Sequence, residues 1–559
     1  MISLPTRNSE LALRRADFRS VPEMLDYAAR GDTGITFYNV RGEILSALPW
    51  RDVRARAQVM ARRLIGAGFA PGERILVTAD TWPGFFDTFF GAQYAGLLPV
   101  PVSIPVGIGG KDAYLDQLRR QLAASGAVAA VGVDDLAGFL AEAAKEFPAV
   151  RLHGGLAALQ ALPEKQVDLR PLGPDDLCYI QFSSGSTRHP HGVQIAQRAL
   201  MANLAGMTGP AGLDVVAGDR AVSWLPLYHD MGLIGFLMAP LSSQLSIDYL
   251  TPRDFARRPT QWLNLISRNR GTIAYSPSFG YDLVARRAKA GLPADIDLSC
   301  LQIAGIGADM IQAAALERFA TAVAAAGFDR RAFLASYGMA ELCVGLSFGR
   351  RFGGVRFDGD GGRPFAVCGA VLPHHRVQIR DRDGVVHGER RIGRLYVQGP
   401  SVMPGYYGRP EASAAVLAGG WLDTGDLGDW HGEELVITGR AKDLMIVNGR
   451  NIWPQDIEWA VEGLSRLRRG DACAFALEAG EREEIVLLVQ CFAEEAGERA
   501  ELMGGIRQVV KEAVGIDCRI VLISRRHRLP LTSSGKLSRT RARENFVAGL
   551  YADALDAAA

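Results

Sequence analysis

Short apolar segments alternate with helical patterns over the first three quarters of the chain. Between the first two of these segments, Phe85, Phe86, Phe89 and Phe90 recur at helical spacing and form an apolar stripe, which we expect to face the core. Strands separated by helices predict an α/β fold in which helices cover a largely parallel sheet. The predicted strands are residues 73–79, 177–182, 221–225, 271–276, 301–306 and 332–336.

The pattern changes at about residue 365, where β segments separated by Gly and Asp begin. We expect residues 365–440 to form a smaller β subdomain of a large N-terminal domain, residues 1–440. The remaining residues, 441–559, show two strands, a helix at 505–514 and a further strand, enough for a small α+β domain. The predicted fold class is therefore α/β, with a large N-terminal domain of layered α/β subdomains plus a β subdomain, and a small C-terminal α+β domain.

Length and composition agree with this division and exclude some partners. A chain of 559 residues exceeds what one hydrophobic core usually organises. Its 62 basic and 61 acidic residues nearly cancel, which argues against nucleic acid or an anionic membrane as a partner. We find neither a secretory signal pattern nor an apolar stretch of about 18 residues, so we expect a cytoplasmic protein without a membrane span. The seven Cys are odd in number and lack metal-site spacing, which favours reduced thiols.

A Ser- and Gly-rich segment follows the strand predicted at 177–182. It reads SSGSTRHPHG, residues 183–192, and a run compatible with a helix comes next. Small residues allow backbone N–H groups to approach an anion closely, and the hydroxyls add donors. No lysine follows Gly192, so the segment is not the GxxxxGK[ST] phosphate loop. Taken alone, it could equally be an ordinary surface loop.

Four further segments contain residues whose side chains could take part in binding or catalysis. In the first, His229 and Asp230 stand where an apolar helix is predicted to begin, an arrangement that could also be a structural pair with Asp230 as the helix cap. In the last, Lys536 lies among small residues, and the chain has only seven lysines among its basic residues. Read without further context, Lys536 would be a surface lysine. The segments are SWLPLYHDMGLIG (223–235), ASYGMAE (335–341), WLDTGDLG (421–428) leading into TGRAKDLMIVNGRNIWPQDIE (438–458), and LTSSGKLSR (531–539).

These segments, in this order, resemble the motifs of the adenylate-forming superfamily of acyl-CoA synthetases, fatty acyl-AMP ligases, peptide-synthetase adenylation domains and luciferases. The residues in these motifs are most similar to those of fatty acyl-AMP ligases, and the resemblance spans nearly the whole chain. The family's phosphate loop usually reads [ST]SG[ST]TGxPKG. Here Arg188 replaces Gly and His191 replaces Lys. The resemblance implies ATP and Mg²⁺ as cofactors, with Arg188 as the candidate source of positive charge, unless it is a solvated loop residue.

The resemblance also implies roles for individual residues. Lys536 would stabilise charge on the carboxylate and α-phosphate, His229 would lie beside the acid, and Glu341 would hold Mg²⁺. Thr187 is a catalytic candidate within the phosphate loop. Tyr337 would lie against the adenine, and Asp426 would accept hydrogen bonds from the ribose hydroxyls. The implied nucleotide-binding residues are Ser183, Ser184, Gly185, Ser186, Thr187, Arg188, Gly307, Ala308, Asp309, Tyr337, Gly338, Asp426, Arg440 and Lys442.

The implied reaction is activation of a fatty acid to acyl-AMP, followed by acyl transfer to a phosphopantetheine thiol. The C-terminal domain would be mobile and would turn about Lys442 between the two steps. Apolar residues follow Asp230 with no acid placed for an amine, which favours an acyl tail over an amino acid. The residues of the PLYHDMGL and WPQDIE motifs favour an acyl carrier protein as acceptor. The short segment 341–369 keeps a fatty acyl-CoA ligase as an alternative, and Arg188 and His191 keep a non-catalytic nucleotide or acyl sensor as another.

Overall fold

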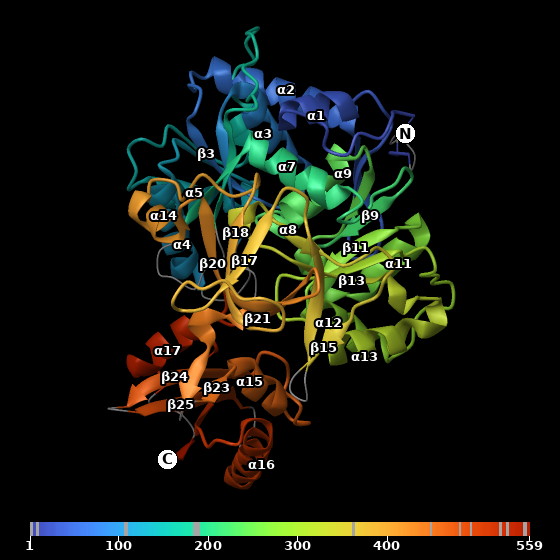
Figure 1. Ribbon diagram of the computed structural model, residues 1–559. Helices are drawn as coiled ribbons and strands as arrows, with labels where there is room; N and C mark the ends of the chain where they lie inside the picture. Colours follow the sequence, from blue (N-terminus) through green and yellow to red (C-terminus); the bar gives the residue numbers. More distant parts are fainter. Residues whose placement is uncertain are drawn as a thin grey trace.

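We describe a computed structural model of the chain, in which a large domain sits above a small C-terminal domain (Figure 1). The α/β fold class predicted from the sequence is confirmed, as is the α+β character of the small domain. The structure describes residues 4–6, 10–104, 110–182, 191–359, 364–447, 450–479, 482–491, 495–524, 528–532, 536–551 and 556–558.

The central sheet has a parallel half that is buried on both faces. Every residue of its strands β9 to β12 is buried, as expected for parallel strands that are covered on both faces, and a buried ion pair joins Arg220 of β9 to Asp248 of β10. The strand β2 (Ile44–Pro49) extends this half antiparallel at its edge. The parallel strands, in spatial order, are β13 (Phe333–Tyr337), β12 (Ile303–Ile306), β11 (Ile273–Ser276), β9 (Arg220–Ser223), β10 (Ser246–Tyr249) and β1 (Gly34–Tyr38).

The β segments after residue 365 continue the same sheet. β14 (Ser347–Phe348) pairs antiparallel with β13 on one side and with β16 (Phe365–Val371) on the other. Buried and less buried residues alternate along β20, as in a sheet with one face packed on the core and the other directed toward solvent. The strands beyond β16 are β21 (Glu434–Arg440), β20 (Trp421–His431), β18 (Gly393–Gln398) and β17 (Arg376–Arg380).

A second, parallel sheet packs near the first, with helix α3 (Pro83–Ala95) between them. This sheet has the order β4 (Leu98–Val102), β3 (Arg74–Thr78), β5 (Ala129–Val131) and β6 (Leu152–Gly154). Every residue of α3 is buried, which confirms the core position expected for its phenylalanines. Phe86 contacts Phe37 of β1 with ring centroids 5.4 Å apart. The helix also buries the polar side chains of Asp87, Thr88 and Gln93.

The strand predicted at 177–182 is confirmed, but the run that follows the Ser-rich segment differs from the sequence expectation. β7 (Leu177–Phe182) pairs antiparallel with β8 (Gly192–Ala196), and only then does α7 (Gln197–Thr208) begin. The sequence predicted a helix-compatible run starting at residue 194. Val193 and Ile195 alternate with less buried neighbours and are themselves buried, so this stretch follows the period of a strand. The Ser-rich segment therefore joins two antiparallel strands and does not open a helix.

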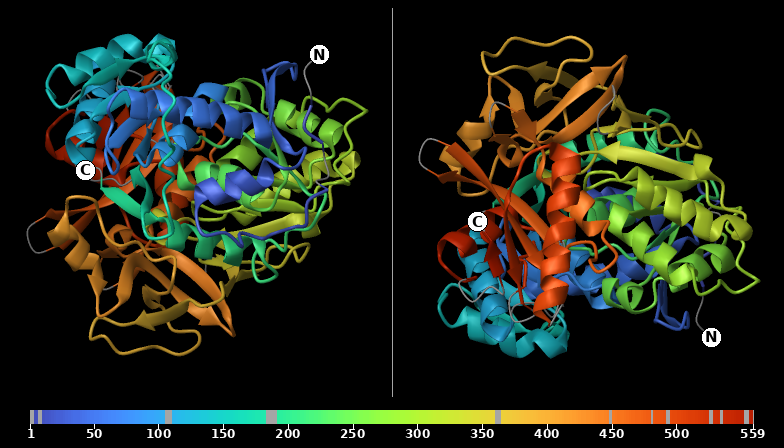
Figure 2. Two further views of the ribbon diagram at one scale, coloured as in Figure 1. Left: turned by 90° about the horizontal axis from the view of Figure 1, so that it is seen from above. Right: turned by 90° about the horizontal axis from the view of Figure 1, so that it is seen from below.

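The C-terminal elements have hydrophobic clusters of their own. The sheet order is β24 (Ala472–Ala479), β25 (Arg482–Gln490), β26 (Arg519–Ile523) and β27 (Asp556–Ala558). Helix α16 (Ala496–Val514) starts earlier than predicted, because a buried stripe that includes Leu502 and Ile506 outweighs the low helix propensity of two adjacent glycines. Seen from below, these elements lie over the middle of the larger domain (Figure 2).

The remaining C-terminal elements begin where the chain passes from the large domain into the small one. After β21 come η6 (Ala441–Asp443), the hairpin β22 (Met445–Val447) and β23 (Arg450–Ile452), and helix α15 (Pro454–Glu462); α17 (Arg539–Val547) follows the Lys536 segment. All seven cysteines are free, and six are buried, which agrees with the expectation of reduced thiols. Among the helices of the described ranges, none is long and apolar enough to cross a membrane.

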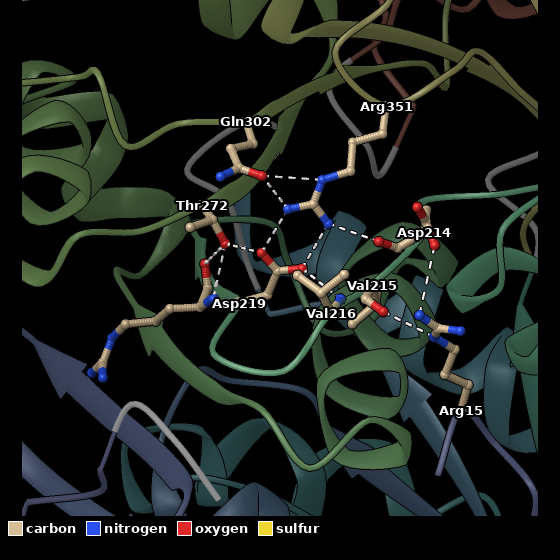
Figure 3. Close-up of polar contacts among 9 residues, drawn as sticks. Arg15, Asp214, Val215, Val216, Asp219, Thr272, Gln302 and Arg351 are labelled. Atoms are coloured by element: carbon tan, nitrogen blue, oxygen red, sulfur yellow. Dashed lines mark hydrogen bonds and ion pairs between the residues drawn. The ribbon is translucent and has the colours of Figure 1, made fainter. Parts of the chain in front are cut away.

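A buried polar network ties the loop after β14 to the amino ends of the parallel strands (Figure 3). The Arg351 guanidinium donates to both carboxylate oxygens of Asp219, at 2.8 and 2.9 Å, and its Nε donates to Gln302 Oε1 at 3.2 Å. The Thr272 hydroxyl donates to Asp219 Oδ1 at 2.7 Å. Asp219, Thr272 and Gln302 precede β9, β11 and β12 respectively, so one arginine fixes three strands and the segment that leads toward β16.

We expect Asp219→Ala to destabilise the large domain strongly. Asp219 is 2% exposed, and its loss leaves the 13% exposed Arg351 guanidinium without its charge partner, which typically costs about 3 to 5 kcal/mol. The midpoint of thermal unfolding should fall by several degrees. As a control, Asp175→Ala removes an exposed ion pair with Arg198 and should leave the midpoint nearly unchanged. Equal effects of the two substitutions would contradict the role assigned to the network.

Candidate active site

A cleft of about 470 Å³ lies where the large domain, the antiparallel strands and the C-terminal domain meet. Its floor is formed at the carboxyl ends of β12 and β13, the edge of a parallel sheet where ligands commonly bind. The strands β20 and β21 supply one wall, and the C-terminal domain supplies another. The predicted site residues that line it are Ala308, Asp309, Tyr337, Gly338, Asp426, Arg440, Lys442 and Lys536.

Tyr337, Asp426 and Arg440 form a connected group in this cleft. The Tyr337 hydroxyl donates to Asp426 Oδ2 at 2.6 Å, and Arg440 Nε lies 3.6 Å from Asp426 Oδ1. The β20–β21 register places Asp426 directly opposite Arg440. Burial raises the pKa of the Asp426 carboxyl, although Arg440 and the Tyr337 hydroxyl act in the opposite direction. The carboxylate retains acceptor capacity beside Tyr337, as the proposed contact with ribose hydroxyls requires.

The turn after β12 has an unusual backbone. Ala308 has φ +67°, in the left-handed region that non-glycine residues seldom adopt. A Cβ on Gly307 would lie 2.9 Å from the Ser336 carbonyl oxygen, so this position favours glycine. The turn therefore presents the Ala308 carbonyl to the cleft. Backbone strain of this kind persists where surrounding contacts enforce it.

Lys536 reaches this turn from the C-terminal domain, and its Nζ donates to the Ala308 carbonyl oxygen. Its own turn is held by Thr532 N, which donates to the Lys536 carbonyl oxygen at 2.7 Å, and by a bridge between Leu531 and Leu537. Burial lowers the pKa of the Lys536 amino group, and Asp309 opposes that shift. The surface-lysine alternative does not describe this structure, because the ammonium group lies inside the cleft.

Glu341 lies in η5 (Ala340–Leu342), directly after β13, and is almost fully buried. Its Oε1 accepts a hydrogen bond from the Tyr406 hydroxyl at 2.9 Å, and burial raises the pKa of the carboxyl. Among the described residues, no group of three or more His, Cys, Asp and Glu could hold a metal by itself. A single carboxylate still fits Mg²⁺, which often takes one or two protein carboxylates and completes its shell with phosphate oxygens and water.

His229 and Asp230 stand at the start of helix α8 (Asp230–Leu233), with His229 Nδ1 2.6 Å from Asp230 Oδ1. Burial raises the pKa of the Asp230 carboxyl, but His229 and the Met231 N–H outweigh it and lower the pKa overall. Asp230 Oδ1 also accepts a hydrogen bond from the adjacent Met231 amide, and the N-cap of α8 is His229, without a side-chain cap bond. The His–Asp pair of the structural alternative is therefore present, but Asp230 is not the cap. Asp230 instead sets the orientation of the imidazole.

Comparison with known proteins decides the family. The family model described as "AMP-binding enzyme" matches residues 33–407. The chain belongs to the AMP-binding enzymes. This confirms the superfamily recognised from the motifs and the enzyme class that it implies.

Three relatives cover nearly the whole chain. A protein of Caulobacter vibrioides, provisionally assigned as an acyl-CoA synthetase, is 45% identical over 98% of both chains. The long-chain-fatty-acid–AMP ligase FadD32 of Mycolicibacterium smegmatis is 30% identical over 92% of this chain and 91% of its own. A solved structure from studies of fatty acyl-adenylate ligases of E. coli and L. pneumophila has 39% identity and a TM-score of 0.91, covering 97% of this chain and all of its own.

Part of the phosphate-binding prediction lies outside the described residues of this AMP-binding enzyme. Its neighbour His191 is described: the ring packs on Tyr406 with centroids 4.7 Å apart, and Tyr406 in turn donates to Glu341. The segment's end is thus connected to the candidate Mg²⁺ carboxylate through one aromatic ring. The predicted residues outside the described ranges are Ser183, Ser184, Gly185, Ser186, Thr187 and Arg188.

The AMP-binding enzyme also has site residues that sequence reasoning missed. Arg539, the last residue of the LTSSGKLSR segment, donates to both oxygens of Glu458, at 2.9 and 2.6 Å, and to Asp443 Oδ2 at 3.1 Å. It thereby fixes the Lys536 segment to α15 and to η6. Its place in the motif was the available signal. Tyr406 and Arg469 stand in no recognised motif: the fold brings Arg469 to the cleft and Tyr406 to Glu341.

Proposed function

We propose that this AMP-binding enzyme activates a fatty acid with MgATP and passes the acyl group to the phosphopantetheine thiol of an acyl carrier protein. A carboxylate oxygen would attack the α-phosphorus, the bond from that phosphorus to the oxygen bridging to the β-phosphorus would break, and pyrophosphate would leave with the electron pair. The observation that carries the proposal is Lys536, which enters from the C-terminal domain beside Tyr337 and Asp426.

Charge neutralisation is the main requirement of this reaction, since two anions must meet. Lys536 would stabilise the negative charge that develops between the carboxylate and the α-phosphate. Asp426 would orient the ribose, and Tyr337 would offer its ring to the adenine. Mg²⁺, held by Glu341 and phosphate oxygens, would withdraw charge from the triphosphate. Direct attack by the substrate carboxylate needs no covalent nucleophile from the protein, and the proposal assigns that role to none of the side chains that line the cleft.

The acid is proposed to be a medium or long fatty acid. The helix that continues from α8 through η2 (Ile234–Met238) buries Leu233, Ile234 and Phe236, so apolar groups surround the position after His229. Asp230, the acidic residue at this point, is occupied by His229 rather than open to an amine. An apolar environment of this kind favours an alkyl chain through burial of its CH₂ groups.

The two steps would require two positions of the C-terminal domain, residues 441–559, relative to residues 1–440. In the present arrangement Lys536 is inside the cleft, as acyl-AMP formation needs. The second position would withdraw Lys536 and admit the phosphopantetheine thiol. Lys442, in the short η6 segment between β21 and β22, is the proposed pivot.

Acid-dependent exchange of labelled pyrophosphate into ATP tests the proposal. We expect exchange with medium and long fatty acids and little with aromatic or amino acids. Acyl transfer should then be compared between holo acyl carrier protein and CoA, with faster transfer to the carrier protein. Preference for an amino acid would overturn the substrate class, and faster transfer to CoA would favour the acyl-CoA ligase alternative. A complete absence of exchange would favour the non-catalytic sensor.

A further inference from the structure

Arg469 connects the C-terminal domain to the same turn that Lys536 contacts. It lies in the loop between α15 and β24, and its Nη2 is 3.8 Å from Asp309 Oδ2 of the large domain. Asp309 directly follows Ala308, whose carbonyl accepts the Lys536 ammonium. Two C-terminal segments that are far apart in sequence therefore meet adjacent residues of one turn. The Arg469 side chain is 21% exposed, so solvent screens this ion pair only in part.

The loop that carries Arg469 is fixed by its own domain. Gly470 N donates to Glu462 Oε1 at 2.6 Å, and Arg468 N donates to Asp471 Oδ2 at 2.7 Å. Gly470 has φ +85°, a conformation that favours glycine. Burial raises the pKa of Glu462 to about 7, while Arg469 acts to lower it. Because these bonds do not involve the large domain, the loop can present the arginine in either position of the domain.

The turn of the large domain that carries Asp309 is also fixed by its own hydrogen bond. Met310 N donates to Asp309 Oδ1 at 2.8 Å, which holds the carboxylate and leaves Oδ2 directed at Arg469. Arg286 of helix α12 (Ser278–Ala288) lines the same cleft, but its guanidinium is paired with Asp282 of its own helix, which leaves Asp309 to Arg469.

We propose that Arg469 and Asp309 form a latch that holds the C-terminal domain in the position in which Lys536 occupies the cleft. The latch rests on the proposed function, and it acts by positioning rather than by contact with the reacting atoms. A partly exposed pair stabilises one arrangement modestly, so it can shift the population of domain positions and still open in each cycle. Breaking it should therefore slow acyl-AMP formation and spare acyl transfer.

The decisive variant is Arg469→Gln, which removes the charge at similar length. We expect the rate of fatty-acid-dependent pyrophosphate exchange to fall about five- to tenfold, while transfer from pre-made acyl-AMP to the acceptor is unchanged or faster. Raising the salt concentration should slow exchange by the wild type and have less effect on the variant, because salt screens the pair. Arg466→Gln is the matched control: its partners Glu498 and Glu501 belong to its own domain, so both half-reactions should be unchanged.

A charge swap separates the latch from a direct role of Asp309 in nucleotide binding. Arg469→Asp and Asp309→Arg alone should each slow exchange, and the two together should recover part of the loss. A pair of fluorophores on the two domains should report fewer molecules with the domains in the present arrangement for Arg469→Gln. Unchanged exchange in Arg469→Gln, equal loss in both half-reactions, or no recovery in the swap would overturn the latch. If the wild type itself shows no exchange, the proposed function fails instead.

Discussion

Replacing Lys536 with alanine should lower the rate of acyl-AMP formation by about 10²-fold or more, the usual effect of removing one charge contact from a transition state. The Lys536 ammonium lines the cleft, where it is bound to the Ala308 carbonyl and lies close to Asp309. The same variant should still transfer the acyl group from pre-made acyl-AMP, because that step is proposed to occur after Lys536 has left the cleft.

Single-turnover assays of the two half-reactions measure this difference. Lys511→Ala is a suitable control, since Lys511 is an exposed lysine on α16 of the same domain and should affect neither step. Circular dichroism should confirm that Lys536→Ala remains folded. If both half-reactions fall equally in a folded Lys536→Ala protein, Lys536 supports the structure of the domain and the alternation of positions is refuted.

Lys442→Pro should produce the opposite pattern, with acyl-AMP formation retained and acyl transfer lowered on the order of 10²-fold, because proline fixes φ at the proposed pivot. Lys442 lies in the three-residue η6 segment, which joins β21 of the large domain to β22 of the small one. A helical turn is compatible with the φ of proline, so the present arrangement of the domains should persist. The second position, which needs a different backbone angle, should not form.

Lys442→Ala separates the backbone effect from the side chain. It leaves φ free and should keep acyl transfer within severalfold of the wild type, whereas loss of transfer in both variants would assign the effect to the ammonium group. Loss of acyl-AMP formation in Lys442→Pro would show that the hinge supports the first step as well. The rate of acyl transfer from pre-made acyl-AMP should be measured for both variants under the same conditions.

Much of the fold followed from local patterns, and the exceptions have physical causes. The predicted strands are all present because short runs such as 177–182 are buried on both faces, which leaves few alternatives for their backbone. The β7–β8 hairpin was missed because residues 194–204 contain Gln, Ala and Leu, good helix formers whose preference is overridden where Val193 and Ile195 pack. The sequence predicts a β subdomain at 365–440 within the large domain, and in the structure the two residues of β14 join its strands to the central sheet.

Some residues of the candidate site could also be predicted from the sequence, and others could not. Tyr337, Asp426 and Lys536 could be predicted because each stands in a recognisable motif, and the structure brings all three to one cleft. The Arg469–Asp309 pair could not be predicted, because a contact between residues so distant in sequence leaves no local signal. Arg351 was missed for the same reason: nothing in its neighbourhood indicates that it meets Asp219.

The position of β1 in the central sheet determines when this part of the sheet can form during synthesis. β1 comprises Gly34–Tyr38, yet its parallel partner is β10, Ser246–Tyr249. At about 5 to 20 residues per second, the ribosome needs on the order of 10 to 40 s to deliver that partner. Throughout this interval α3, whose residues are all buried in the native state, has no complete central sheet to cover it. Until β10 has been made, the side of α3 that packs toward the central sheet has no complete partner in the nascent chain, so we expect substitutions that weaken β10 to lower the yield of folded protein.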